Sequence, residues 1–479
     1  MAACGKLSIV FVDEHGKVWT LGAGGPHLGL GTDTNTGQVR PACVGGCDLF
    51  GALVVSVAAG RMHNAAVAAD GSLHTWGSGR DGRLGHGDME VRWRPTRLGK
   101  ELFAGSPAVH VACGHKHTVL ITAAGRVWTC GLGGSGRLGH GDKENKWVMT
   151  QVGIDFGGAQ IVYVAAGVAH SAAVGADGSV WTWGRGTSGC LGHNDEQDRL
   201  VPTTMADEVF GGVKVVLVAA GTMHTVAVAD DGSFFVWGYG GDGQLGLGDN
   251  ANRLAPTRMM PEAFRDSRVL TAACGSMHTL TVTEGGSIYS FGEGGRGMLG
   301  HNDEHNRPVP THIEAQHFGD AQIVSVAAGH DHSWAVTADG VLFTWGRVQG
   351  LGHGDGEDKL VPTRVTPQLL QGPRVGRCHS IPLLPMLALA FAMGTHPRLG
   401  SAAQIDTATG GSRKSRRQQG TEPAATDTMG CAYGEMPGEL VHQVVETCAC
   451  VLWPEGRAGE LEGVVRLLGG GIMKLRVST

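Results

Sequence analysis

Short apolar runs alternate with glycine-rich turns along the chain up to about residue 385. Between residues 161 and 204, such runs cover residues 161–165, 170–174 and 180–183. Asp177-Gly178, a dipeptide typical of tight β-hairpin turns, separates the second run from the third. A fourth strand is expected around residues 202–204, after a polar loop. The pattern therefore predicts four short strands in this segment, and it shows no sustained helical period.

The same pattern returns every 53 to 55 residues. An aromatic residue followed by glycine ends the third run in most units, and L-G-x-[GN]-D then closes units such as residues 84–88. Seven four-stranded units in register are typical of propeller blades. We predict an all-β fold, a seven-bladed β-propeller of four-stranded blades with a short, partly helical or disordered C-terminal tail. A further motif, A-[AC]-G-x-x-H, ends at His63, His117, His170, His224, His278 and His332.

Taken together, A-A-G-x-x-H, D-G-x-V-x-x-W-G and L-G-H-G-D at this period resemble the regulator-of-chromosome-condensation repeat family, whose members form seven-bladed β-propellers. The resemblance covers about residues 7–385. In this alignment the first unit begins at Leu7 and lacks the A-A-G-x-x-H half. Cys378-His379-Ser380 echoes His170-Ser171. We therefore expect residues 373–384 to pair with the strands that start at Leu7 and to close the ring.

Three regions follow from this alignment: a propeller over residues 1–385, an apolar segment and flexible linker over residues 386–429, and a short helical tail over residues 430–479. In the tail, residues 439–453 have apolar side chains at helical spacing, and residues 461–468 are a second helical candidate. The linker carries a basic run that is either a nuclear-import patch or a solvated charge cluster. Its residues are Arg413, Lys414, Arg416 and Arg417.

Composition narrows the class of protein. With 42% hydrophobic residues and a net charge of -6, the chain is neither disordered over most of its length nor strongly basic in the way of nucleic-acid-binding proteins. It has no run of eighteen apolar residues and no secretory signal at its start. Eleven cysteines are scattered without a C-x-x-C pair, which favours reduced thiols. We expect the protein in the cytoplasm, the nucleus or both, without a membrane partner.

Motifs that could carry chemistry are explained by the repeat. G-x-G-x-x-G occurs five times, but L-G-H-G-D or a variant follows it, whereas a dinucleotide site needs a helix at the third glycine. The repeated histidines lie at equivalent positions around a ring, so we expect them to hydrogen-bond the backbone in each blade and not to converge on a metal ion. No catalytic residue, metal or cofactor is predicted, and the protein is not expected to be an enzyme.

The candidate binding residues are those that vary inside the fixed G-x-x-H motif. A scaffold that fixes a turn while leaving its side chains free can display a binding surface, and exposed methionines suit an adaptable one. The alternative is that these residues only cap the strand ends. The partner-binding candidates are Arg61, Met62, His115, Lys116, Thr222, Met223, Ser276, Met277, His330 and Asp331.

The resemblance implies three known kinds of activity. Guanine-nucleotide exchange on the small GTPase Ran depends on a wedge inserted into a blade, and the even spacing here leaves no room for it. Ultraviolet-B reception in plants uses tryptophans at the first variable position of G-x-x-H, where this chain has none. Ubiquitin ligases of the HECT type need a catalytic domain larger than the 109 residues after residue 370.

We therefore expect a non-enzymatic protein-interaction module or scaffold. The first alternative is a guanine-nucleotide exchange factor for a small GTPase of the Ran type. The second is a substrate-binding adaptor of a ubiquitin ligase.

Overall fold

The computed structural model describes residues 2–13, 15–31, 38–44, 53–348, 351–365, 461–466 and 472–477. The chain divides into two compact units, residues 1–393 and residues 394–479. Among the described residues, no helix is long and apolar enough to cross a membrane.

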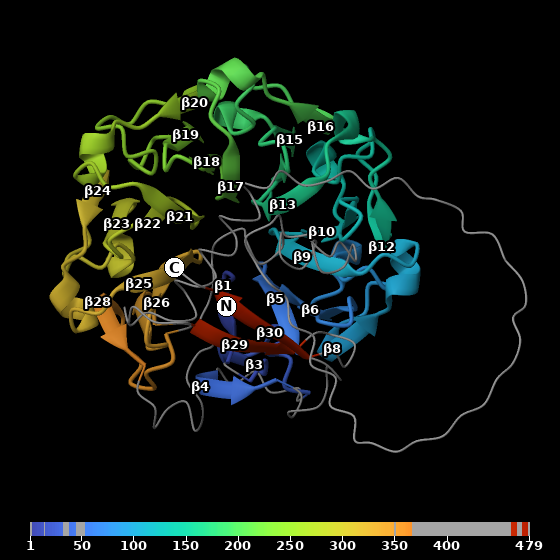
Figure 1. Ribbon diagram of the computed structural model, residues 1–479, viewed down its shortest axis with the longest axis horizontal. Helices are drawn as coiled ribbons and strands as arrows, with labels where there is room; N and C mark the ends of the chain where they lie inside the picture. Colours follow the sequence, from blue (N-terminus) through green and yellow to red (C-terminus); the bar gives the residue numbers. More distant parts are fainter. Residues whose placement is uncertain are drawn as a thin grey trace, which may run out of the picture. The chain divides into compact units, whose positions relative to one another are not determined.

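The first unit is a ring of seven four-stranded antiparallel sheets (Figure 1), which confirms the predicted seven-bladed β-propeller. In every blade the strands follow one another in chain order, from the first strand to the fourth. Blades 1 to 4 contain β1 (Ala2–Cys4), β2 (Ser8–Val12), β3 (Val18–Gly22), β4 (Gln38–Cys43), β5 (Val54–Ala59), β6 (His63–Ala68), β7 (Leu73–Gly77), β8 (Arg92–Leu98), β9 (Ala108–Cys113), β10 (His117–Thr122), β11 (Val127–Gly131), β12 (Lys146–Gln151), β13 (Ile161–Ala166), β14 (His170–Gly175), β15 (Val180–Gly184) and β16 (Arg199–Thr204). Blades 5 to 7 contain β17 (Val215–Ala220), β18 (His224–Ala229), β19 (Phe234–Gly238), β20 (Arg253–Arg258), β21 (Val269–Cys274), β22 (His278–Thr283), β23 (Ile288–Gly292), β24 (Arg307–His312), β25 (Ile323–Ala328), β26 (His332–Thr337), β27 (Leu342–Gly346) and β28 (Lys359–Arg364).

Helical structure among the described residues consists of short 3-10 turns in the loops. They are η1 (Pro26–Leu28), η2 (Arg80–Gly82), η3 (Lys100–Phe103), η4 (Gly134–Gly136), η5 (Phe156–Gly158), η6 (Thr187–Gly189), η7 (Asp207–Phe210), η8 (Pro261–Phe264), η9 (Gly295–Gly297) and η10 (Ala315–Phe318).

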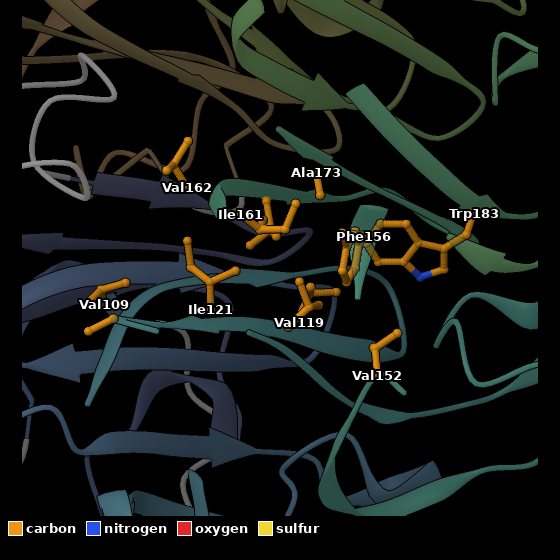
Figure 2. Packing of buried hydrophobic residues seen from close by; sticks show 12 residues of the cluster. Val109, Val119, Ile121, Val152, Phe156, Ile161, Val162, Ala173 and Trp183 are labelled. Carbon is orange, nitrogen blue, oxygen red and sulfur yellow. The ribbon is translucent and has the colours of Figure 1, made fainter. Parts of the chain in front are cut away.

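The core lies between neighbouring blades, because each sheet is covered on both faces. Between blades 3 and 4, Val119 and Ile121 of β10 belong to the same buried cluster as Ile161 of β13 (Figure 2). Phe156 of η5 belongs to the same cluster, and its ring centroid lies 6.3 Å from that of Trp183 in an edge-to-face arrangement (Figure 2). Burial on both faces explains why the second strand of each blade is apolar or small at nearly every position, and not alternately polar.

A ring of seven glycines marks where neighbouring blades approach most closely. A Cβ atom on Gly60 would lie 2.4 Å from the carbonyl oxygen of Gly114, and one on Gly329 would lie 2.7 Å from that of Gly5. Such distances exclude any side chain, so only glycine allows the backbones to meet. The last contact joins blade 7 to blade 1 and completes the ring. The seven glycines are Gly5, Gly60, Gly114, Gly167, Gly221, Gly275 and Gly329.

The predicted closure of the ring by residues 373–384 is wrong at the position where we placed it. β1 pairs with β2 in the register Ala3↔Val10, and β3 occupies the other edge of β2, so no edge of β2 is left for another strand. Ala3-Cys4-Gly5 is in fact the first half of the A-[AC]-G-x-x-H motif, with Ser8 in place of histidine. Residues 373–384 themselves lie outside the described residues.

In the second unit, β29 (Leu461–Arg466) and β30 (Ile472–Val477) form an antiparallel pair with the register Leu461↔Val477. The helix predicted over residues 461–468 is therefore wrong. Val464 and Val465 are β-branched, and three consecutive glycines at residues 469–471 interrupt any helix, which together favour a hairpin. The predicted linker, the helix over residues 439–453 and the basic run at residues 413–417 lie outside the described residues.

Candidate functional site: the G-x-x-H face

One end of each blade carries two structures that lie side by side: the G-x-x-H turn between the first and second strands, and the loop after the third strand. His63 and Gly77 are paired in the sheet, which brings the start of β6 to the end of β7. The backbone N–H of Ser78 then donates to the carbonyl of Met62 at 2.8 Å. The equivalent bond recurs around the ring, as from Arg185 to Ala169. We call the surface formed by these seven turns and loops the G-x-x-H face.

In blades 2 to 6, the fixed histidine of the turn joins its blade to the next one. His117 Nε2 lies 3.0 Å from Ser171 Oγ, and Ser171 Oγ donates to the carbonyl of Arg137 at 2.9 Å. Because the single hydroxyl hydrogen goes to that carbonyl, the histidine must donate through its Nε2–H. The same relay occurs from His63 to Thr118, from His170 to Thr225, from His224 to Thr279 and from His278 to Ser333.

These bonds agree with the predicted structural role of the histidines but correct the predicted partner. The contact goes to a side-chain hydroxyl of the neighbouring blade and reaches the backbone only through it. Burial lowers the pKa of His63, His224 and His278 to about 3, because an imidazolium ion is poorly solvated there. The histidines are therefore neutral near pH 7, as the relay requires.

A second set of histidines acts inside the blades. His86 Nε2 lies 2.9 Å from Thr75 Oγ1, and the Asp88 carboxylate accepts the backbone N–H of Glu90 and pairs with Arg92. These contacts recur in blades 3, 4, 6 and 7 with the residues of the L-G-H-[GN]-D motif. The predicted turn role of the aspartates agrees with this geometry. The described residues hold no group of three or more His, Cys, Asp or Glu side chains placed to bind a metal ion.

The glycines of G-x-G-x-x-G also have a packing role. In blade 2 the third glycine, Gly82, has φ 80° and a Cβ there would lie 2.5 Å from the Cα of Trp147 in blade 3. A three-residue 3-10 turn, η2, stands where a dinucleotide site would need the start of a helix. These loops therefore bring blades together at their outer edges.

The variable residues of the turns are less exposed than we predicted. Met277 is half-buried and accepts a contact from Gln244 Nε2 at 3.6 Å, and Ser276 is buried with its hydroxyl donating to the carbonyl of His330. For these two residues the strand-capping alternative is supported. Met62, Thr222 and Met223 are also half-buried, so the expectation of freely exposed methionines is wrong.

In blade 7 the variable pair forms a charged cluster. The Asp331 carboxylate contacts the His330 ring and pairs with Arg347 at 3.1 Å. Burial alone raises the pKa of Asp331, but the contacts with His330 and Arg347 hold it well below its usual value. Asp331 is therefore ionised and already partnered within its own blade.

Blades 1 to 3 place basic side chains on three adjacent turns. The Lys6 backbone N–H donates to the carbonyl of Gly60, which directly precedes Arg61, and Arg83 Nη1 donates to the carbonyl of His115 at 3.4 Å. Burial and the nearby charges of Arg61, Lys116 and Arg83 lower the pKa of His115 to about 4. The structure thus brings together three candidates, Arg61, His115 and Lys116. We missed Lys6 because the repeat was aligned from Leu7.

The other side of the face is acidic. Asp242, Glu293 and Asp331 come from blades 5, 6 and 7. Burial, together with the charges of Asp242 and Asp331, raises the pKa of Glu293. Neither Asp242 nor Glu293 forms an ion pair with a described residue, so the G-x-x-H face has a basic half and an acidic half.

Comparison with known proteins agrees with the repeat pattern. Residues 70–121, 124–174, 177–228, 231–282 and 285–336 match the family model for the regulator of chromosome condensation (RCC1) repeat. The ultraviolet-B receptor UVR8 of Arabidopsis thaliana is 34% identical over 360 residues, which cover 74% of this chain and 80% of that protein. The human E3 ubiquitin-protein ligase HERC2 is 32% identical over 373 residues, 75% of this chain but only 8% of that protein. The structure of yeast RCC1 (Prp20) bound to Kap60 superimposes with a TM-score of 0.64 at 25% identity, covering 76% of this chain and 86% of that chain.

Proposed function

Because the chain belongs to the family of proteins built from RCC1 repeats, we propose that it is a non-enzymatic protein-interaction module that binds a protein partner through the G-x-x-H face. The fold by itself is compatible with many functions, so the proposal depends on the site. The proposal is supported by a difference between two kinds of position in the G-x-x-H motif: the fixed positions hold the blades together, and the variable positions carry side chains that a partner can reach.

The fixed glycine and histidine of that motif make contacts between neighbouring blades. Gly114 allows the backbones to meet, and His117 is buried and bonded to the next blade. The variable positions between them include Arg61 and Lys116, which are partly exposed and have no ion-pair partner among the described residues. Charged groups left unpaired on a rigid surface are available to a partner, and binding residues are commonly held on such loops.

Site-specific photo-cross-linking tests the proposal. A photoreactive residue at Met62, on the G-x-x-H face, should give reproducible cross-links to a protein in cells. The matched control is Ala176, an exposed residue in the hairpin turn at the opposite end of blade 4. Cross-linking at Met62 that is no stronger than at Ala176 would contradict the proposal.

Exchange on a small GTPase is the second candidate, favoured by the similarity to yeast RCC1 over most of that chain. Release of a fluorescent guanine nucleotide from purified Ran, and then from a panel of other GTPases, tests it directly. Strong acceleration by the protein would replace the scaffold proposal with an exchange factor. Unchanged release would leave the interaction module in place.

One other role belongs to the proposal in a weaker form. The similarity to HERC2 supports a role as a substrate-binding adaptor of a ubiquitin ligase, which co-purification with ligase subunits would test. Photoreception is not proposed despite the similarity to UVR8, since the first variable position of the turns carries no tryptophan. We place the protein in the cytoplasm, the nucleus or both, and imaging of the tagged protein would check this.

A further inference from the structure

We infer that the basic half of the G-x-x-H face, formed by Lys6, Arg61 and Lys116, binds an acidic segment of the partner protein. The inference rests on the proposed function and adds the chemistry of the partner. It starts from the placement of the three side chains on turns that touch one another.

The three turns are neighbours in the glycine ring. A Cβ on Gly5 would lie 2.2 Å from the carbonyl oxygen of Gly60, and one on Gly60 would lie 2.4 Å from that of Gly114. Lys6 and Arg61 directly follow their glycines, and Lys116 is two residues after Gly114. Their side chains therefore leave the backbone from three adjacent points of a rigid ring, which suits a short extended segment that carries several carboxylates.

In the basic half, cationic side chains outnumber the carboxylates near the turns. Among the described residues of blades 1 to 4, the G-x-x-H turns and residues 78–84, 132–138 and 185–191 of the loops carry seven cationic side chains and one carboxylate, that of Asp81, which is paired with Arg83 at 2.7 Å. The rest of these loops adds carboxylates such as Asp88, which pairs with Arg92, and Asp198, which acts on Arg137. Arg137 is only 8% exposed, and its guanidinium donates to carbonyls, including that of Val168 at 3.0 Å. The seven are Lys6, Arg61, Arg80, Arg83, Lys116, Arg137 and Arg185.

At the outer edges of the blades, basic residues with a structural role are paired with carboxylates. There, Arg92 pairs with Asp88 at 2.6 Å, and five further blades repeat an ion pair with the same spacing in the sequence. Lys6, Arg61 and Lys116 have no such partner among the described residues. Unpaired cations clustered at one place raise the local concentration of anionic ligands and speed their association.

The acidic half distinguishes a protein segment from a nucleic acid. A phosphate backbone running across the face would leave the basic half and meet Asp242 and Glu293, where like charges repel it. The chain as a whole carries a net charge of -6, which adds to this repulsion. A short acidic peptide is confined to the basic half and avoids that cost.

Fluorescence anisotropy with the full-length protein and a labelled ten-residue glutamate-rich peptide tests the inference. The unmodified protein should bind the peptide, and binding should weaken with added salt because the charges are partly exposed. The Arg61→Glu/Lys116→Glu variant should bind about tenfold more weakly or worse, since two attractive charges become repulsive. The matched control, Arg126→Glu/Lys214→Glu, makes the same change in net charge at exposed residues at the opposite end of the blades, and its affinity should stay within about twofold.

Each outcome decides the inference. Equal weakening in both double variants would overturn it, because the effect would then come from net charge alone. Tighter binding of a single-stranded oligonucleotide or of anionic vesicles than of the peptide would also overturn it. If the charge-reversed protein fails to fold, Arg61→Gln/Lys116→Gln gives the same comparison with a smaller expected loss. Absence of peptide binding with persistent cross-linking at Met62 would remove the inference and leave the proposed function standing.

Discussion

Blade 3 meets blade 4 through a polar relay, whereas blade 7 meets blade 1 through apolar side chains. At the first junction His117, Ser171 and the carbonyl of Arg137 form a chain of hydrogen bonds. At the second, the equivalent of the serine is Ile9, and His332 Nε2 has no partner among the described residues. Trp334 is fully buried there in a cluster with Ile9, in a column where other blades carry alanine, valine or leucine.

The two junctions show that neighbouring blades must approach closely at the ring glycines, whereas the side-chain contacts between them can be either polar or apolar. The glycine contacts are the same at both places, with Cβ distances of 2.5 Å from Gly114 to Gly167 O and 2.7 Å from Gly329 to Gly5 O. Hydrogen bonds or buried apolar area can then hold the blades together. Stability should therefore respond differently at the two junctions.

Acidification should have the largest effect, because it acts on every histidine of the relays at once. The folded-state pKa of His63 is about 3 and that of His170 about 4, both below the usual 6.5. The unfolded chain therefore takes up protons first as the pH falls, so stability is complete above about pH 6.5 and is lost progressively toward pH 4. Each such histidine contributes up to about 1.4 kcal/mol per pH unit in this window. Urea unfolding between pH 7 and pH 4 measures the effect, and a constant midpoint would contradict it.

Trp334→Ala should lower the free energy of unfolding by about 3–5 kcal/mol, since it empties the apolar seam between blades 7 and 1. Val226 occupies the same column in blade 5, so Val226→Ala is the matched control with a smaller cavity. The loss from Trp334→Ala should be independent of pH, because no titrating group is removed. Equal losses in the two variants would show that the seam is not a special junction.

His117→Ala should cost about 1–3 kcal/mol, because it leaves the buried Ser171 hydroxyl without its donor. His332→Ala removes the same side chain where Nε2 has no partner, so it should cost about 1 kcal/mol less. The His117 variant should also lose less stability on acidification than the unmodified protein. Chemical denaturation of both variants at pH 7 and pH 5 checks these points, and identical losses at pH 7 would count against the relay.

Much of the ring could be predicted from the sequence because the repeat fixes both the strands and their turns. β13, β14 and β15 begin at the residues where the apolar runs of residues 161–183 begin. The first strand of blade 1 was missed because Ser8 stands where the motif has histidine, which leaves the A-[AC]-G-x-x-H pattern incomplete there. The hairpin of residues 461–477 was missed because its strands lie outside the repeat and short apolar runs fit either periodicity.

The candidate site was predictable in position but not in detail. Arg61 and Lys116 were identified because they vary inside a fixed motif. The contacts of Ser276 and Met277 with neighbouring blades could not be predicted, because they join residues more than thirty positions apart in the sequence. The separation of charge between the two halves likewise depends on which blades become neighbours when the ring closes.

The central claim is that fixed residues of the G-x-x-H motif hold the ring while variable ones bind the partner. The most direct test measures both thermal stability and affinity for the acidic peptide in Arg61→Glu/Lys116→Glu and in His117→Ala. We predict that the first variant loses peptide binding and keeps its melting temperature, and that the second keeps its affinity and melts at a lower temperature. Loss of both properties in both variants, or the opposite assignment, would contradict the claim.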